Sequence, residues 1–254
     1  MRHLCLVILL VLAGTAGAAA QSAAPPVVQR PTPDFLFGEP KGSLGIRGSW
    51  LFARAGSDVF DFVQQHLTID KGAFNTPAIG TDLAVAINPR LDVVVGFDYS
   101  QASVASEYRA FVDNNRQPIE QTTRLREANL GGTLRVALVP RGTGISRLAW
   151  IPARVTPYVG AGGGALWYEF TQQGDFIDVL SANRAVFTDN FRSTGWTPSA
   201  HALGGVGVRI QRRTYVTVEG RYLWAAAPLQ RQFEDFDPID LAGFRLSAGV
   251  NVLF

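Results

Sequence analysis

Eight segments of this chain alternate apolar and polar residues with a period of two. They cover residues 44–52, 79–88, 91–100, 127–138, 157–170, 201–210, 216–224 and 244–254. Successive side chains of a β-strand point to opposite faces, so each segment is predicted to be a strand with one apolar face. In the glycine-rich segment 157–170 the facing is ambiguous, and we assign the apolar side to Val159, Ala161, Ala165 and Trp167. The chain is therefore expected to be all-β.

The connections between these segments alternate between short and long. Tight breaks follow residues 88 and 210, and the connection 139–153 on the same side is longer. Long connections cover residues 55–75, 103–120, 171–197 and 226–240. Strands joined in this way are antiparallel and follow an up-and-down order, with the long loops together at one end.

Period-two alternation alone fits either a soluble barrel or sandwich with its apolar face inside or a membrane barrel with that face outside. A strand face in water normally carries lysines, yet the only lysines, Lys41 and Lys71, lie outside the eight segments. At 47% hydrophobic and 17% charged residues, the chain is also apolar for a soluble protein. These features favour a closed transmembrane barrel, because closure leaves no unpaired backbone in lipid.

The polar faces of the segments carry arginines and carboxylates in equal numbers. The arginines are Arg47, Arg135, Arg209, Arg221 and Arg245, and the carboxylates are Asp82, Asp92, Asp98, Glu127 and Glu219. An unpaired charge away from bulk water is costly, whereas the planar guanidinium can bind carboxylates across a narrow lumen. Because eight strands leave room only for side chains, we expect ion pairs to fill the interior in place of a water channel. A solvated strand face is the alternative interpretation.

Aromatic residues lie where the strands that run toward the long connections end. They are Trp50, Phe52, Phe97, Tyr99, Trp167, Tyr222 and Trp224. Tryptophan and tyrosine favour the headgroup level, where an apolar ring and a polar tip are both satisfied. These residues are predicted to form an aromatic girdle at one membrane interface.

The N-terminal region indicates export. Arg2 and His3 precede the apolar run 4–12, and the alanines at 18–20 fit a cleavage site, so residues 1–20 are predicted to be a signal peptide. Residues 21–41, rich in proline and alanine, form an extended lead-in, and residues 42–254 form the barrel. Cys5 is the single cysteine, so the exported chain has no disulfides. A net charge of +2 is too small to indicate a nucleic-acid partner.

Two stretches, TPYVGAGGGALWYEF in the fifth segment and the terminal GVNVLF, carry a resemblance to a known family. Over residues 42–254 the chain resembles the eight-stranded outer-membrane barrels of the OmpA, OmpX and OmpW type, of Gram-negative envelopes. The resemblance implies an outer-membrane location, contact with outer-membrane lipid, and recognition of Phe254, Val252 and Val250 by the barrel assembly machinery. The chain stops at the barrel, so no peptidoglycan-binding domain is expected to follow.

Two features of the sequence are compared with known cofactor and metal sites because they partly match them. Residues 160–165 satisfy G-x-G-x-x-A, but the helix and βαβ unit that a dinucleotide site needs are missing. His66 has no second ligand at metal spacing. We expect neither a cofactor nor a metal.

Ser199, His201 and Glu219 are predicted to share the inner face, and they invite comparison with a hydrolytic triad. Lipid A deacylases use a histidine, a serine and a glutamate on the lipid-facing side of such a barrel. Here the order is Ser-x-His and the face is inward, which favours a hydrogen-bonded lumen histidine.

The long connections are where a partner would bind. Residues 57–67 are predicted to form a short helix at the barrel rim with Ser57 as its cap, and residues 171–197 carry Phe176, Phe187 and Phe191. The sequence predicts a non-enzymatic outer-membrane barrel with a structural or surface-interaction role. The alternatives are an OmpW-like transporter of small hydrophobic molecules and a lipid A-modifying enzyme.

Overall fold

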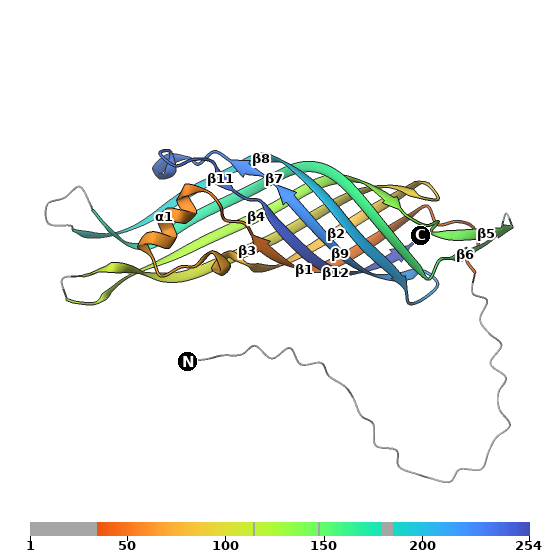
Figure 1. Ribbon diagram of the computed structural model, residues 1–254, viewed down its shortest axis with the longest axis horizontal. Helices are drawn as coiled ribbons and strands as arrows, with labels where there is room; N and C mark the ends of the chain where they lie inside the picture. Colours follow the sequence, from red (N-terminus) through yellow and green to blue (C-terminus); the bar gives the residue numbers. More distant parts are fainter. Residues whose placement is uncertain (1–34, 114, 147, 179–184) are drawn as a thin grey trace, which may run out of the picture. The chain divides into compact units, whose positions relative to one another are not determined.

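A computed structural model describes residues 35–113, 115–146, 148–178 and 185–254. The predicted signal peptide and most of the predicted lead-in lie outside these residues. Eight strands form one closed antiparallel barrel (Figure 1). They are β1 (Gly42–Ala53), β2 (Thr76–Asn88), β3 (Leu91–Val112), β4 (Pro118–Ala137), β7 (Val155–Ile177), β8 (Val186–Arg209), β9 (Thr214–Trp224) and β12 (Gly243–Leu253).

The order around the barrel is β1-β12-β9-β8-β7-β4-β3-β2. Each strand pairs with its neighbours in the sequence, and the first and last strands close the ring from Ser43↔Leu253 to Ala53↔Gly243. The backbone amide of Phe254 donates to the carbonyl of Gly42, which continues this seam beyond β12. The predicted fold class, an eight-stranded up-and-down barrel, is confirmed.

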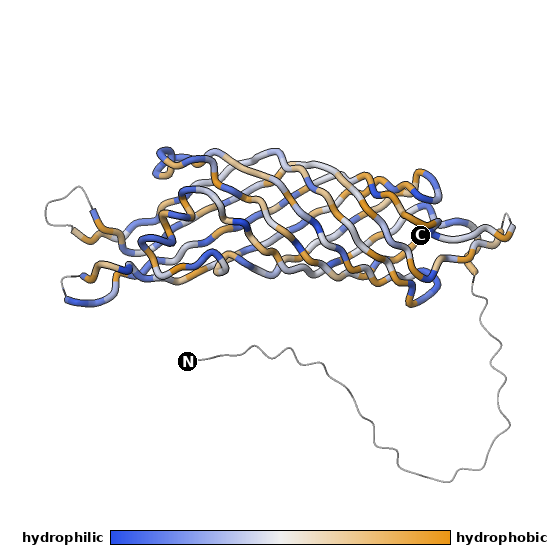
Figure 2. Tube along the Cα trace, in the orientation of Figure 1, coloured by the Kyte–Doolittle hydropathy of each residue, from blue (hydrophilic) through white to orange (hydrophobic). Residues whose placement is uncertain are grey.

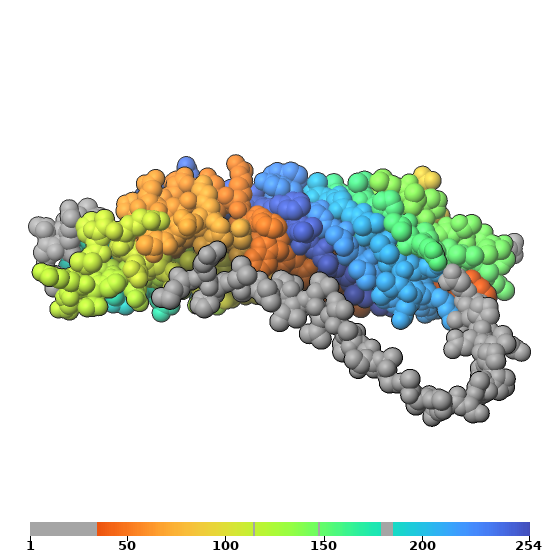
Figure 3. Space-filling model, turned by 60° about the horizontal axis from the view of Figure 1, so that its bottom comes forward, coloured from red at the N-terminus to blue at the C-terminus, as the bar shows by residue number. Residues whose placement is uncertain are grey.

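The apolar rows of the strands face outward. Ile46 is 70% exposed and Ile79 is 67% exposed, whereas the residues before and after each of them turn inward and are buried or half-buried. Figure 2 shows hydrophobic and hydrophilic residues alternating along the strands, and Figure 3 shows the strands packed side by side as oblique bands. In β7, Val159 is exposed and Tyr158 is buried, so the ambiguous fifth segment faces as assigned. An outward apolar surface on a closed barrel is the arrangement that a bilayer requires.

Two glycines of β7 allow its close approach to β4. A Cβ added at Gly162 would collide with the backbone of Gly132, and one at Gly164 would collide with the carbonyl of Leu130. The glycine-rich stretch therefore reflects backbone packing within the barrel wall.

Two of the predicted long loops are mostly strand, which corrects the sequence interpretation. β3 and β4 stay in register as far as Glu107↔Glu120 and pair again at Val112↔Pro118, and β7 and β8 stay paired as far as Ile177↔Val186. These hairpins extend past the apolar zone, so their outer faces are polar and the alternation that marks the membrane strands is lost there. Backbone pairing continues without this alternation of apolar and polar residues, because each strand still has a hydrogen-bonding neighbour.

The end of the barrel that carries these hairpins is called the long-loop end. It also holds α1 (Asp58–His66), which was predicted as a rim helix, with Ser57 at its N-cap. Further short elements there are η1 (Lys71–Phe74), β10 (Ala226–Ala227), η2 (Arg231–Phe233) and β11 (Ile239–Asp240). In the described part of the chain, no helix has the length and apolarity needed to span a membrane.

The opposite end is called the short-turn end. It carries the hairpin of β5 (Gly142–Ser146) and β6 (Ala149–Pro152), as well as the C-terminus (Figure 1). Leu36 forms an isolated antiparallel bridge with Trp150 of β6 through two backbone hydrogen bonds of 2.8 and 3.0 Å. The segment before β1 is thereby attached to this end of the barrel.

Candidate functional site

The middle of the lumen contains a belt of charged side chains from six strands. The central belt comprises Arg47 (β1), Asp82 (β2), Asp98 (β3), Glu127 (β4), Glu219 and Arg221 (β9) and Arg245 (β12). All of these residues were predicted to face inward, and the antiparallel register brings them to one level of the barrel. The belt has three arginines and four carboxylates, so the guanidinium groups are shared between acids.

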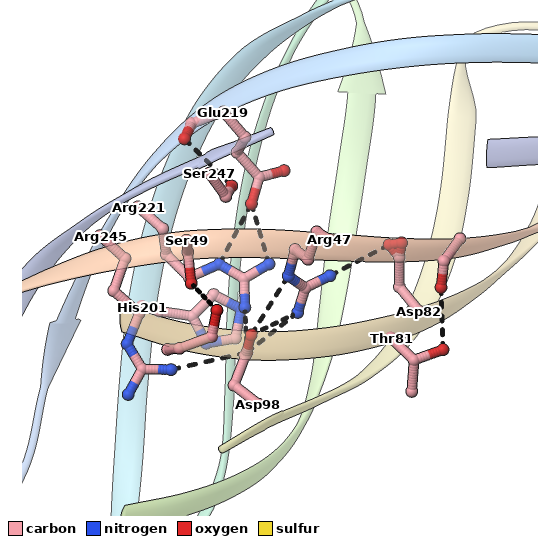
Figure 4. A network of polar contacts seen from close by, with 12 residues as sticks. Arg47, Ser49, Thr81, Asp82, Asp98, His201, Glu219, Arg221, Arg245 and Ser247 are labelled. Atoms are coloured by element: carbon pink, nitrogen blue, oxygen red, sulfur yellow. Dashed lines mark hydrogen bonds and ion pairs between the residues drawn. The ribbon is translucent and has the colours of Figure 1, made fainter. Parts of the chain in front are cut away.

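Asp98 lies at the centre of this belt. Nη2 of Arg47 donates to both Asp98 carboxylate oxygens at 2.9 Å, and Nη1 of Arg221 donates to Oδ2 at 3.1 Å. Figure 4 shows these two guanidinium groups converging on Asp98 from different strands. Only 2% of Asp98 is exposed, so these charge-assisted hydrogen bonds replace the water that the carboxylate loses on burial.

The other belt carboxylates each bind one arginine. Nη1 of Arg47 lies 3.0 Å from Oδ1 of Asp82, and Nη2 of Arg221 lies 2.9 Å from Oε1 of Glu219. Nη2 of Arg245 donates to Oε2 of Glu127 at 3.1 Å. Nη1 of Arg245 lies 3.9 Å from Oδ2 of Asp98, which is too long for a hydrogen bond. Neither this atom nor Nε of Arg245 has a hydrogen-bond partner among the described residues. Glu127 therefore depends on a single guanidinium.

Three predicted interior charges lie at the short-turn end, outside the central belt. Nη2 of Arg135 donates to Oδ2 of Asp92 at 3.0 Å. Arg141, which the sequence analysis did not single out, donates from Nη1 to Oδ1 of the same carboxylate at 2.5 Å. Arg209 lies at the end of β8, opposite Tyr215. Arg141 precedes β5 in a turn, and no periodic pattern gives the direction of a turn side chain.

A cavity of about 80 Å³ occupies the lumen at this end. Its lining includes Asp92, Arg135, Arg141, Trp150, Tyr158 and Tyr215. The space beside Arg47, Arg135 and Glu219, toward the central belt, is about 10 Å³. This second space, lined in part by the belt itself, has room for about one water molecule.

The long-loop end of the lumen is filled by an apolar cap. α1, η1, η2 and β11 turn their apolar side chains onto inward residues of the strands, including Leu125, Leu166 and Phe170. Phe60 of α1 is fully buried, and its ring lies 4.9 Å from that of Phe74 and 6.1 Å from that of Phe170, centroid to centroid. The hydroxyl of Tyr168 donates to the carbonyl of Pro228 at 2.6 Å, which ties the loop before η2 to the barrel wall.

Ser199, His201 and Glu219 face the lumen but bind separate partners. Ser199 Oγ donates to Asn129 Oδ1 at 2.8 Å, and His201 Nε2 lies 2.8 Å from Thr133 Oγ1. Glu219 accepts hydrogen bonds from Tyr158 and from Arg221. A hydrolytic triad needs the serine, the histidine and the carboxylate bonded in series, and these side chains are not arranged in that way.

The predicted aromatic girdle lies on the outer surface at the long-loop end. Trp50, Phe52, Phe97 and Trp224 are between 42% and 49% exposed, whereas Tyr99, Trp167 and Tyr222 are half-buried. Trp196, opposite Trp167 in the β7–β8 register, lies in the same ring and was missed because it fell in a segment assigned to a loop. The terminal residue Phe254 is 58% exposed.

No family model and no curated protein matches this chain. Solved structures that resemble it include Neisserial surface protein A, which is 12% identical, with a TM-score of 0.47 and coverage of 84% of this chain and 97% of that one. Another is the outer membrane protein OprG from Pseudomonas aeruginosa, with 11% identity, a TM-score of 0.45, and coverage of 86% and 99%. A third is Ail of Yersinia pestis, with 12% identity, a TM-score of 0.41, and coverage of 85% and 99%.

The strand order and the outward apolar band decide the architecture. Ring closure leaves no strand edge within the band, which is what a strand structure in lipid needs. The predicted outer-membrane location agrees with this arrangement. The chain folds as an eight-stranded antiparallel barrel with an outward apolar band, which is the architecture predicted from its resemblance to barrels of the OmpA and OmpX type.

Proposed function

We propose that this barrel is a non-enzymatic envelope protein whose lumen is closed to solutes and whose long-loop end faces outward from the cell. It contributes to envelope structure and displays its hairpins and rim helix as an interaction surface. The observation that supports this function is that two groups of side chains fill one lumen. The apolar cap fills its long-loop end, and the central belt fills its middle. Eight strands enclose little more volume than their own side chains occupy.

Closure of the lumen predicts the absence of ion conductance. When the refolded protein is inserted into planar bilayers, we expect no stepwise current above that of protein-free membranes. A conducting porin of known activity, inserted under the same conditions, serves as the control. Reproducible unitary steps, or saturable uptake of a small hydrophobic solute into vesicles, would instead favour the transporter alternative.

The positions of Ser199 and His201 predict that the protein does not remove acyl chains from lipid A. Both side chains of β8 face the lumen and hydrogen-bond to β4 beyond β7, away from the bilayer where the acyl chains lie. In cells that produce the protein, mass spectra of lipid A should match those of cells producing the His201→Ala variant. A missing acyl chain in the first sample, restored in the second, would contradict the proposal.

The end of the chain supports assembly in the outer membrane. Val250, Val252 and Phe254 form the outward row of β12 and its terminus, directly beside the seam that closes the barrel. We infer that the barrel assembly machinery reads this row before β1 covers the edge of β12. The barrel's lipid contacts are then made by the outward apolar rows.

A further inference from the structure

Three rows of outward side chains cross β3, β4, β7 and β8 in hydrogen-bonded register at the long-loop end. The first is aromatic, with Tyr99, Ala128, Trp167 and Trp196 opposite one another. The second contains Gln101, Arg126, Glu169 and Thr194. The third contains Ser103, Arg124, Thr171 and Arg192. The second and third rows are called the arginine rows.

The depth of the arginine rows follows from strand geometry. Consecutive rows are two residues apart, which for a strand tilted by about 40° is a step of about 5 Å along the membrane normal. The aromatic row marks the interface, since tryptophan and tyrosine favour that level. On each strand, the residues of the arginine rows therefore lie about 5–10 Å beyond that strand's residue of the aromatic row, on its headgroup side.

The arginine rows carry more positive charge than their own acid can balance. Arg126 donates to Gln101 at 3.0 Å and to Glu169 at 2.8 Å, and Arg192 also pairs with Glu169. Arg126 and Arg192 thus share the one carboxylate of these rows, and Arg124 makes no ion pair with it, so the three arginines exceed their acid by two positive charges. Nε of Arg124 is buried without a hydrogen-bond partner among the described residues, and the side chain of Arg192 is 51% exposed. Donors on β4 and β8, the two strands that flank β7, remain available.

We propose that the arginine rows bind a phosphorylated headgroup of an outer-leaflet lipid, and that the acyl chains of this lipid lie against the aromatic row. Guanidinium groups match phosphate oxygens in bidentate geometry, and two of them that reach over β7 from β4 and β8 can hold one phosphate group between them. The position beside lipid, in place of the barrel mouth, favours a lipid over a soluble polyanion. The proposal rests on the outer-membrane placement of the barrel.

The test compares two lipids and two double variants. Protein refolded in octyl glucoside, a detergent without phosphate, is titrated with bisphosphorylated lipid A and with the same lipid after removal of both phosphates, and bound lipid is measured by native mass spectrometry. The test variant is Arg124→Gln with Arg192→Gln. Its matched control is Arg212→Gln with Arg213→Gln, which removes the same charge from exposed positions in the turn at the other end.

We expect the wild-type protein and the control to prefer the phosphorylated lipid by about tenfold or more, and the test variant to lose most of this preference. Equal binding of both lipids by the wild-type protein, or equal losses in both double variants, would overturn the proposal. Complete displacement by excess inorganic phosphate or by dextran sulfate would assign the arginine rows to a soluble anion instead. Unboiled gel mobility of each variant shows separately whether the barrel itself has formed.

Discussion

Replacing Arg245 by methionine is expected to lower the free energy of unfolding of the refolded barrel by about 3–5 kcal/mol. Glu127, which is 3% exposed, would lose its one guanidinium partner and keep only a hydroxyl contact of 3.5 Å from Ser100. The belt would then hold two arginines against four carboxylates. Urea titration in detergent micelles, followed by tryptophan fluorescence, measures the change.

An exposed ion pair of the same barrel provides the control. Arg54 lies 3.5 Å from Asp240, and its side chain is 64% exposed, so Arg54→Met should cost less than about 1 kcal/mol. Adding Glu127→Gln to Arg245→Met should restore most of the lost stability, because the uncompensated charge is removed. If Arg54→Met and Arg245→Met had equal effects, or if Glu127→Gln gave no rescue, the buried pair would not stabilise the barrel as described.

Replacing Phe60 by alanine is expected to cost about 3–5 kcal/mol, because the ring is fully buried in the apolar cap and its removal leaves a cavity there. The matched control lies on the same helix. Phe62 is 43% exposed, stacks on His66 and meets the ring of Phe236 edge to face, so Phe62→Ala should cost less than about 1 kcal/mol.

The urea midpoints of Phe60→Ala and Phe62→Ala show whether α1 is anchored in the barrel or lies loosely over its mouth. In the second case both substitutions would have similar, small effects. Far-ultraviolet circular dichroism of each variant, compared with the wild-type spectrum, shows whether the strands of the wall are intact. A loss of strand signal in Phe60→Ala without denaturant would mean that the cap is needed for the barrel to form at all.

The membrane part of the fold could be predicted because lipid imposes a strict rule on each strand. Every residue such as Ile46 or Ile79 that faces hydrocarbon must be apolar, so the strand and its facing are both visible in the sequence. Beyond the bilayer this rule ends. The paired residues Glu107 and Glu120 continue the β3–β4 ladder with charged side chains in water, and period-two analysis assigns them to a loop.

The composition of the lumen could be predicted, but its pairing could not. Which arginine meets which carboxylate depends on the stagger between strands, and this stagger placed Arg135 with Asp92 at the short-turn end, away from Asp98. Arg141 reaches the same carboxylate from a turn, where side-chain direction has no period. The rim helix was visible in residues 57–67, yet the burial of Phe60 inside the barrel depends on the width of the barrel.

The pairing of Asp98 has a consequence for the order of assembly. Its partners come from both ends of the chain, Arg47 at 51 positions and Arg221 at 123 positions along the sequence. Such distant groups meet only after most of the intervening chain is in place. We expect these charges to stay hydrated in any partly zipped intermediate and to shed that water when the last strand docks, so that expulsion of solvent and completion of the barrel form one cooperative, late event.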